Sequence, residues 1–420
     1  MPSKGYIELI RTNADYRRLW FGGAVSDLGG WFNLIALYTL IRQLTGSPLA
    51  LGIVFFLRTM SWALASPFGG LIADRFSRRR LMIAADLVRA LVVLGFLLVD
   101  EARELPLLYG LFALQVVIGT VFTPARRASI PNITSEQELL TANALSTATA
   151  ASLIAVGAAL GGLATEWLGI RQVFLIDSLS FLVSAFFISR TSIPQSTEAV
   201  SGRGWREALS DIADGWRYMR SHPRVGRIAV TKSAWAVAGS GLVYMLALLG
   251  GEVMPYAPAI GIGLLYGARG LGTGLGPVAA RRWVPERTSW PTLFGLGMVA
   301  SGVAYLFAGS LPFSALTFVF VALAHGPFGA NWALSTVLLQ ERTADRYRGR
   351  VFSTELLLLS LAGAAGNLSA SLLLELSGMT LRPAMLLYAA LLSATGVLWL
   401  AFAVPEERRD EEQAGAEKGP

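Results

Sequence analysis

Long apolar segments alternate with short polar ones along almost the whole chain. Each of twelve segments is long enough to cross the hydrocarbon core of a bilayer, which takes about 20 apolar residues in a helix. The strands of a membrane barrel would alternate in polarity, and these segments do not. The pattern therefore predicts an all-α membrane protein with twelve transmembrane helices, at about 19–41, 49–73, 81–99, 106–124, 139–165, 171–190, 225–250, 257–281, 290–309, 312–339, 351–377 and 382–404.

The longest polar break, at 191–223, divides the segments into two sets of six. Within it, apolar residues recur at helical spacing over 204–220, which is typical of an amphipathic helix lying on a membrane. The second and eighth segments each carry an arginine, then a proline, then a basic exit, which indicates an internal repeat. We expect two pseudo-symmetric six-helix bundles, with domains at 1–190 (bundle), 191–223 (cytoplasmic linker), 224–405 (bundle) and 406–420 (cytoplasmic tail).

Charge gives the orientation. The chain has 420 residues, of which 15% are charged, whereas a soluble protein has about 25%. If connections are numbered alternately, 27 of the 35 Lys and Arg residues fall on the side of the N-terminus and four on the other. This bias predicts a multi-pass protein of the inner (plasma) membrane with both termini cytoplasmic. The net charge of +7 then requires no nucleic acid, because basic loops face anionic headgroups of the membrane lipids.

Composition argues against several kinds of chemistry. The chain has no Cys and only two His, His222 and His325, so we expect no thiolate or His-based metal site and no cofactor. No P-loop motif is present, and no group of residues suggests a catalytic role. The N-terminus lacks the apolar core of a cleaved signal peptide. We expect a protein that is not an enzyme.

Four stretches resemble one family of transporters. They are N-A-D-Y-R-R-L-W at 13–20, the basic turn G-L-I-A-D-R-F-S-R-R at 70–79, P-A-R-R at 124–127 with A-N-A-L at 142–145, and R-G-R-V-F-S at 348–353. Through them, about 13–405 resembles the drug:proton antiporter branch of the major facilitator superfamily, which includes macrolide-efflux and enterobactin-exporter-like proteins. The resemblance implies a secondary transporter that exports its substrate and is driven by protons. We expect amphiphilic small molecules as substrates, alternating access of the two halves, and a monomer.

The resemblance also implies a gating role for the basic turn. In the family, its acid lies near the start of the eleventh span and holds the outward-open state; here that acid is Asp74. The alternative is that the arginines only set topology. The expected gating loop consists of Gly70, Asp74, Arg75, Arg78 and Arg79.

The chain departs from the family at two places. In the basic turn it has Ser77 where the family usually has Gly, which more easily adopts a positive φ. In the fifth span Leu153 and Ala158 replace a Gly and a Pro of the antiporter motif. Close helix packing is still expected at the three small residues that match, Gly157, Gly161 and Gly162.

Ionisable residues inside the spans are candidates for the proton or substrate pathway, since they are costly there. We expect Asp27 either to carry protons or substrate or to form a structural pair, with Arg58 as its partner. Arg269 is the counterpart of Arg58 in the repeat. Each of the other candidates has a structural alternative, hydrogen-bonded packing for His325 and a helix-start acid for Glu355. The five candidates are Asp27, Arg58, Arg269, His325 and Glu355.

Three further charged residues in the spans are expected to have structural rather than transport roles. Asp86 and Arg89 are three residues apart and are expected to pair with each other or with the basic turn. Lys232 is expected to reach the cytoplasmic surface along its stem.

We conclude from the sequence that a proton-coupled exporter is the best interpretation, with a small molecule, protons and membrane lipids as partners. A lipid or lysophospholipid transporter or a siderophore exporter is the alternative within the same class. A membrane sensor or scaffold that transports nothing is the alternative from another class.

Overall fold

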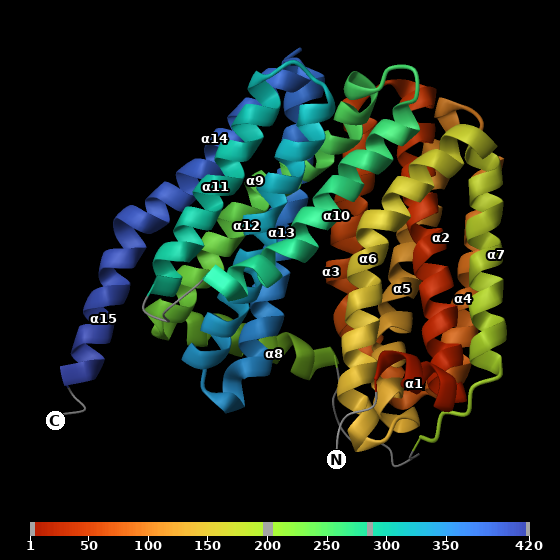
Figure 1. Ribbon diagram of the computed structural model, residues 1–420, viewed down its shortest axis with the longest axis horizontal. Helices are drawn as coiled ribbons and strands as arrows, with labels where there is room; N and C mark the ends of the chain where they lie inside the picture. The colour runs from red at the N-terminus through yellow and green to blue at the C-terminus, as the bar shows by residue number, and fades with distance from the viewer. Residues whose placement is uncertain (1–4, 196–204, 284–288, 417–420) are drawn as a thin grey trace. The chain divides into compact units, whose positions relative to one another are not determined.

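The computed structural model describes residues 5–195, 205–283 and 289–416, which form long helices joined by short turns (Figure 1). The first part contains α1 (Tyr6–Thr12), α2 (Ala14–Thr45), α3 (Pro48–Arg75), α4 (Arg78–Gly95), α5 (Leu105–Ile133), α6 (Glu136–Leu168) and α7 (Ile170–Ser189). The second contains α8 (Trp205–Ser221), α9 (Pro223–Val253), α10 (Pro258–Trp283), α11 (Trp290–Ser310), α12 (Ala315–Arg342), α13 (Asp345–Leu376), α14 (Leu381–Leu398) and α15 (Val404–Ala416). Two 3₁₀ turns, η1 (Phe96–Leu98) and η2 (Ala102–Glu104), connect α4 to α5, and η4 (Trp399–Ala403), a π-helical turn, continues α14.

The prediction of an all-α membrane fold is confirmed. Among the described residues, ten helices are long and apolar enough to cross a membrane. The other two long helices at predicted span positions are α10 and α12. Their apolar runs are interrupted by polar residues such as Arg269 in α10 and His325 and Asn331 in α12.

One boundary differs from the prediction in a way that affects the site. The fourth span was expected to end at 124, where Pro124 begins a P-A-R-R sequence, but α5 continues through Pro124 and Pro131 to Ile133. Proline is tolerated inside transmembrane helices because neighbouring groups satisfy the backbone that it frees. Arg126 is therefore a helix residue rather than a loop residue.

The chain divides into two compact units, residues 1–208 with 254–267, and residues 209–253 with 268–420. In the first unit α2 packs against α6 and α7, α3 against α5, and α4 against α5 and α7. The second unit repeats this pattern: α9 packs against α13 and α14, and α11 against α12 and α14. The same pairing order in both units is what an internal duplication would leave.

Glycines permit the close approaches within each unit. A Cβ on Gly69 of α3 would overlap the carbonyl of Thr120 in α5, and one on Gly276 of α10 would overlap the carbonyl of Gly326 in α12. These two contacts join the second helix of each set of six to the fourth. Small residues at such crossings let the helix backbones approach closely. The resulting van der Waals packing holds the helices together in lipid, where the hydrophobic effect does not.

The helix expected in the linker is present as α8, and it docks on α13. Arg350 Nε donates to Asp211 Oδ1 at 2.9 Å, and Thr354 Oγ1 donates to the carbonyl of Ile212 at 3.0 Å. Gly215 lies at the contact, where a side chain would overlap Thr354. Residues 196–204 of the expected linker lie outside the described part of the chain.

Candidate functional site

A cavity of about 420 Å³ lies in the first unit, and residues of α2 to α7 line it. Its wall carries one carboxylate, Asp27, and three guanidinium groups, those of Arg58, Arg89 and Arg126. Most of the remaining wall is apolar or aromatic. Charged groups inside a membrane bundle usually mark a substrate or ion pathway.

Asp27 is paired with Arg126 across this cavity. The Nη1 atom of Arg126 lies 2.9 Å from Oδ2 of Asp27, and the two side chains are 24% and 40% exposed, so neither is sealed from the cavity. Gly23, one turn before Asp27 on α2, makes room for the pair, because a Cβ there would lie 2.5 Å from Arg126 Nη1. The arrangement allows a proton or a ligand to reach the ion pair.

The expectation that Arg58 pairs with Asp27 was wrong. Arg58 also lines the cavity, on α3, but within the described residues it forms no ion pair or hydrogen bond. With the fourth span expected to end at 124, Arg126 was placed in the loop that follows it. The stretch 128–133 contains Ser129, Pro131 and Asn132, so no local signal in the sequence shows that the helix continues past Pro124.

Arg89 and Asp86 of α4 form the pair expected from their spacing, and Asp86 is fully buried. The Arg89 guanidinium also lies over two rings, 4.3 Å from the centroid of Phe122 and 4.4 Å from that of Phe181. These contacts hold its charge between α5 and α7.

Asp177 of α7 belongs to the same bundle and is also fully buried. Its carboxylate accepts a hydrogen bond from Asn33 Nδ2 at 2.7 Å and a longer one from Ser180 Oγ at 3.3 Å. The bond from Asn33 connects α7 to α2, the bond from Ser180 lies within α7, and together they give Asp177 a structural role.

The second unit brings three of the sequence candidates into two clusters. In the first cluster His325 of α12 is buried, and its Nε2 lies 2.8 Å from the hydroxyl of Tyr305 on α11. Arg269 of α10 lies near enough to act electrostatically on both groups. This geometry favours the hydrogen-bonded packing alternative for His325.

In the second cluster Glu355 of α13 is ion-paired with Lys232 of α9, and both side chains are almost completely buried. The Lys232 ammonium also lies 4.8 Å from the centre of the Trp332 ring. The expectation that Lys232 reaches the cytoplasmic surface is therefore wrong, because Glu355 lies close enough to neutralise it inside the bundle. Spacing along the chain gave no sign of a pair 123 residues apart.

The arginines of the basic turn bind the ends of neighbouring helices. Arg78 Nη1 donates to the carbonyl of Ala128 at 2.7 Å, and Arg79 donates to the carbonyl of Ser189 at the end of α7. Asp74 is half-exposed and lies 4.0 Å from Arg78. Cations suit these positions because helix C-termini carry partial negative charge. The φ of Ser77 is −56°, so this turn does not need the positive φ that glycine would supply.

The three glycines of the fifth span lie at helix crossings. A Cβ on Gly161 would lie 3.0 Å from the Cα of Phe32 in α2, and one on Gly157 would lie 3.2 Å from Trp31 Cβ. Gly162 instead faces α10, 2.5 Å from the carbonyl of Ala259 by the same measure. The helix needs no proline at Ala158, since α6 continues without a break through this stretch.

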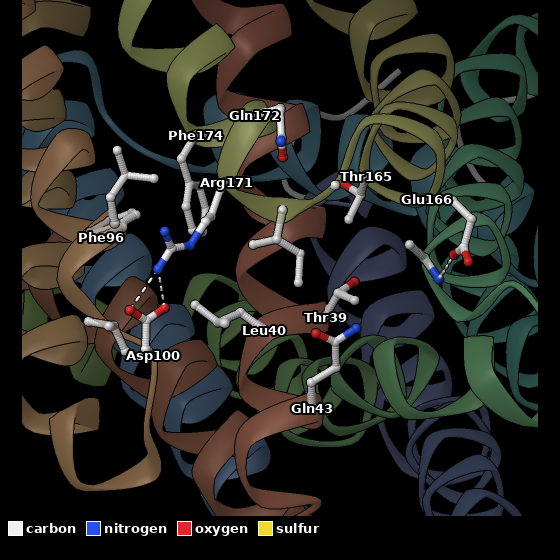
Figure 2. A pocket seen from close by; sticks show the side chains of 15 residues that line it. Thr39, Leu40, Gln43, Phe96, Asp100, Thr165, Glu166, Arg171, Gln172 and Phe174 are labelled. Atoms are coloured by element: carbon white, nitrogen blue, oxygen red, sulfur yellow. Dashed lines mark hydrogen bonds and ion pairs between the residues drawn. The ribbon is translucent and has the colours of Figure 1, made fainter.

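A second cavity in the first unit, of about 450 Å³, lies at the ends of α2, α4, α6 and α7. Figure 2 shows two interactions in its lining: the ion pair in which Arg171 Nη2 lies 2.5 Å from Asp100 Oδ1, and the Glu166 carboxylate, which accepts from the amide of Ala259 at 3.2 Å. Each of its three charged side chains thus has a partner within the protein. No cluster of His, Asp and Glu suited to a metal ion occurs among the residues that the structure describes.

Comparison with curated protein sequences gives distant relatives whose names describe exporters. A protein named as the bacilysin exporter BacE of Bacillus amyloliquefaciens is 27% identical, over 86% of this chain and 88% of its own. Macrolide efflux protein A of Streptococcus pyogenes is 23% identical over 92% and 94%. Enterobactin exporter EntS of Shigella boydii serotype 18 is 23% identical over 82% of each chain.

The fold is also that of solved transporters. A mutant form of the nucleoside transporter NupG aligns with a TM-score of 0.73 at 12% identity, over 92% of this chain and 99% of that one. Residues 19–353 match the sequence profile described as Major Facilitator Superfamily. With two units of matching helix order and this profile over most of its length, the chain belongs to the major facilitator superfamily of transporters.

Proposed function

We propose that this transporter is a proton-coupled exporter of amphiphilic small molecules, and that Asp27 is its coupling carboxylate. The observation that carries the proposal is the ion pair between Asp27 and Arg126, whose charged atoms are 2.9 Å apart. Both residues line the cavity and are partly exposed, so the pair is not sealed inside the bundle. Relatives named as exporters of bacilysin, a macrolide and enterobactin support the direction of transport.

In the proposed cycle, a proton that binds Asp27 removes the negative charge that holds Arg126. The freed guanidinium then changes the charge of the cavity wall and with it the affinity for a ligand. A two-state transporter needs such a difference in ligand affinity between its states, because a ligand that binds both states equally does not shift the equilibrium between them. Asp74 is the proposed gating acid. The arginine bias supports a location in the inner (plasma) membrane with both termini cytoplasmic.

Flux in proteoliposomes tests the coupling. Purified transporter is reconstituted, and movement of radiolabelled erythromycin, bacilysin and enterobactin is followed with and without an imposed proton gradient. We expect the gradient to drive at least one of them uphill with the parent. Asp27→Asn, which keeps the shape and removes the titrating group, should retain binding and lose uphill transport.

Two further variants separate coupling from structure. Asp15→Asn makes the same change elsewhere on α2. Asp15 does not line the cavity, and its Oδ1 lies 3.2 Å from Arg18 Nη1, so this variant should transport as the parent does. If the Asp27 pair is only structural, Asp27→Asn should lose thermal stability and Asp27→Asn with Arg126→Gln should regain it. Uphill transport by Asp27→Asn at the parent's rate would show that Asp27 is not the coupling group.

A further inference from the structure

The charged groups of the first-unit cavity do not all find partners in the protein. Arg126 is paired with Asp27, and Arg89 with Asp86. Arg58, the third arginine of the wall, is exposed and forms no ion pair or hydrogen bond with any described residue.

Among the described residues, no carboxylate forms an ion pair with Arg58. Asp27, the carboxylate of the cavity wall, is paired with Arg126, and the buried Asp177 accepts hydrogen bonds from Asn33 and Ser180 and is not part of the wall. Arg58 is ten residues into the 28-residue helix α3, about 15 Å along it at 1.5 Å per residue. An arginine at that depth is costly unless water or an anion compensates its charge.

The remaining wall suits an apolar body. Trp31, Phe112, Leu153 and Phe181 come from four different helices and surround the same space. A volume of about 420 Å³ falls within the range of pockets that bind small molecules. The cavity thus combines apolar surface with one guanidinium group that lacks a partner.

We infer that Arg58 is the anion-recognition residue of this cavity, and that the ligand is an amphiphile with a carboxylate or a similar anionic group. A guanidinium offers paired N–H donors that match a carboxylate, so one residue can both orient and neutralise the ligand. The inference rests on the proposed function only in taking the exported molecule as the ligand; the site itself requires no proton coupling.

Equilibrium binding to the full-length protein in phosphatidylcholine nanodiscs tests the site. The probes are 2-naphthoate and its neutral counterpart naphthalene-2-methanol, which share the ring system and differ in charge. We expect the parent to bind the carboxylate about tenfold more tightly, as one charge-assisted hydrogen bond can provide. Arg58→Gln should reduce naphthoate binding to the level of the alcohol, and Arg58→Lys should keep part of the difference.

Arg220→Gln is the matched control. Arg220 is also exposed and without a partner among the described residues, but it lies on α8 in the second unit, so its loss should leave both affinities unchanged. Unchanged alcohol binding by Arg58→Gln shows that the cavity is still folded. Equal affinity of the parent for both probes, or naphthoate binding that Arg58→Gln does not weaken, would overturn the inference.

The source of the anion is distinguished by adding phosphatidylglycerol to the nanodiscs. If the lipid competes with naphthoate in the parent but not in Arg58→Gln, a lipid headgroup is the anion at Arg58; if it does not compete, the anion comes from a soluble ligand. The lipid experiment decides only the source of the anion, and anion recognition itself is tested by the dependence of naphthoate binding on Arg58. Naphthoate binding that depends on Arg58, in a protein whose flux ignores the proton gradient, would keep the site and refute the coupling proposal.

Discussion

The buried pair of Lys232 and Glu355 provides the sharpest test of how the second unit is held together. The two side chains are 1% and 5% exposed and come from α9 and α13, which pack against each other. Removing one partner leaves the other charge uncompensated in a medium that solvates it poorly. Breaking such a pair typically costs about 3–5 kcal/mol.

We therefore expect Lys232→Met to destabilise the protein by about that amount. For a unit of this size the shift in Tm would be on the order of 10 °C. The double variant Lys232→Met with Glu355→Gln removes both charges and should recover most of the loss, because replacing a whole buried pair is often close to neutral. Tm is measured by intrinsic tryptophan fluorescence in detergent.

The same helix offers a matched control. Asp345 and Arg348 form an exposed ion pair at 2.8 Å at the start of α13, so Asp345→Asn should leave Tm nearly unchanged. A Tm for Lys232→Met equal to that of the parent, or a double variant less stable than the single one, would refute the reasoning from burial.

Three other predictions address topology, gating and the tail. The chain has no natural cysteine, so Ala213→Cys should resist an impermeant thiol reagent in intact cells while Glu101→Cys reacts; the reverse result would overturn the orientation. Asp74→Asn should shift spin-label distances between the cytoplasmic ends of the two units, and unchanged distances with normal transport would leave the turn a topological role alone. Glu407, which is buried beside Arg342 at 2.6 Å, should hold α15 in place, so Glu407→Gln should speed limited proteolysis of the tail, and an unchanged rate would count against this.

The number and approximate position of the long helices, the repeat and the family could all be predicted from the residues alone. These properties depend on apolar length and on motifs such as the basic turn at 70–79, and both are local in the chain. The local pair of Asp86 and Arg89 could be predicted for the same reason, since residues three apart share one face of a helix.

Which distant charged residues meet could not be predicted, because it depends on how the helices pack. Asp27 pairs with Arg126 rather than Arg58, and Lys232 turns inward to Glu355, because helix rotation and close glycine contacts such as Gly23 fix which faces point at each other. The end of α5 was misjudged for a related reason, since a proline that would end a helix in water does not end one supported by its neighbours in a bundle. The identity of the candidate site therefore depends on packing, which the hydrophobic pattern does not specify.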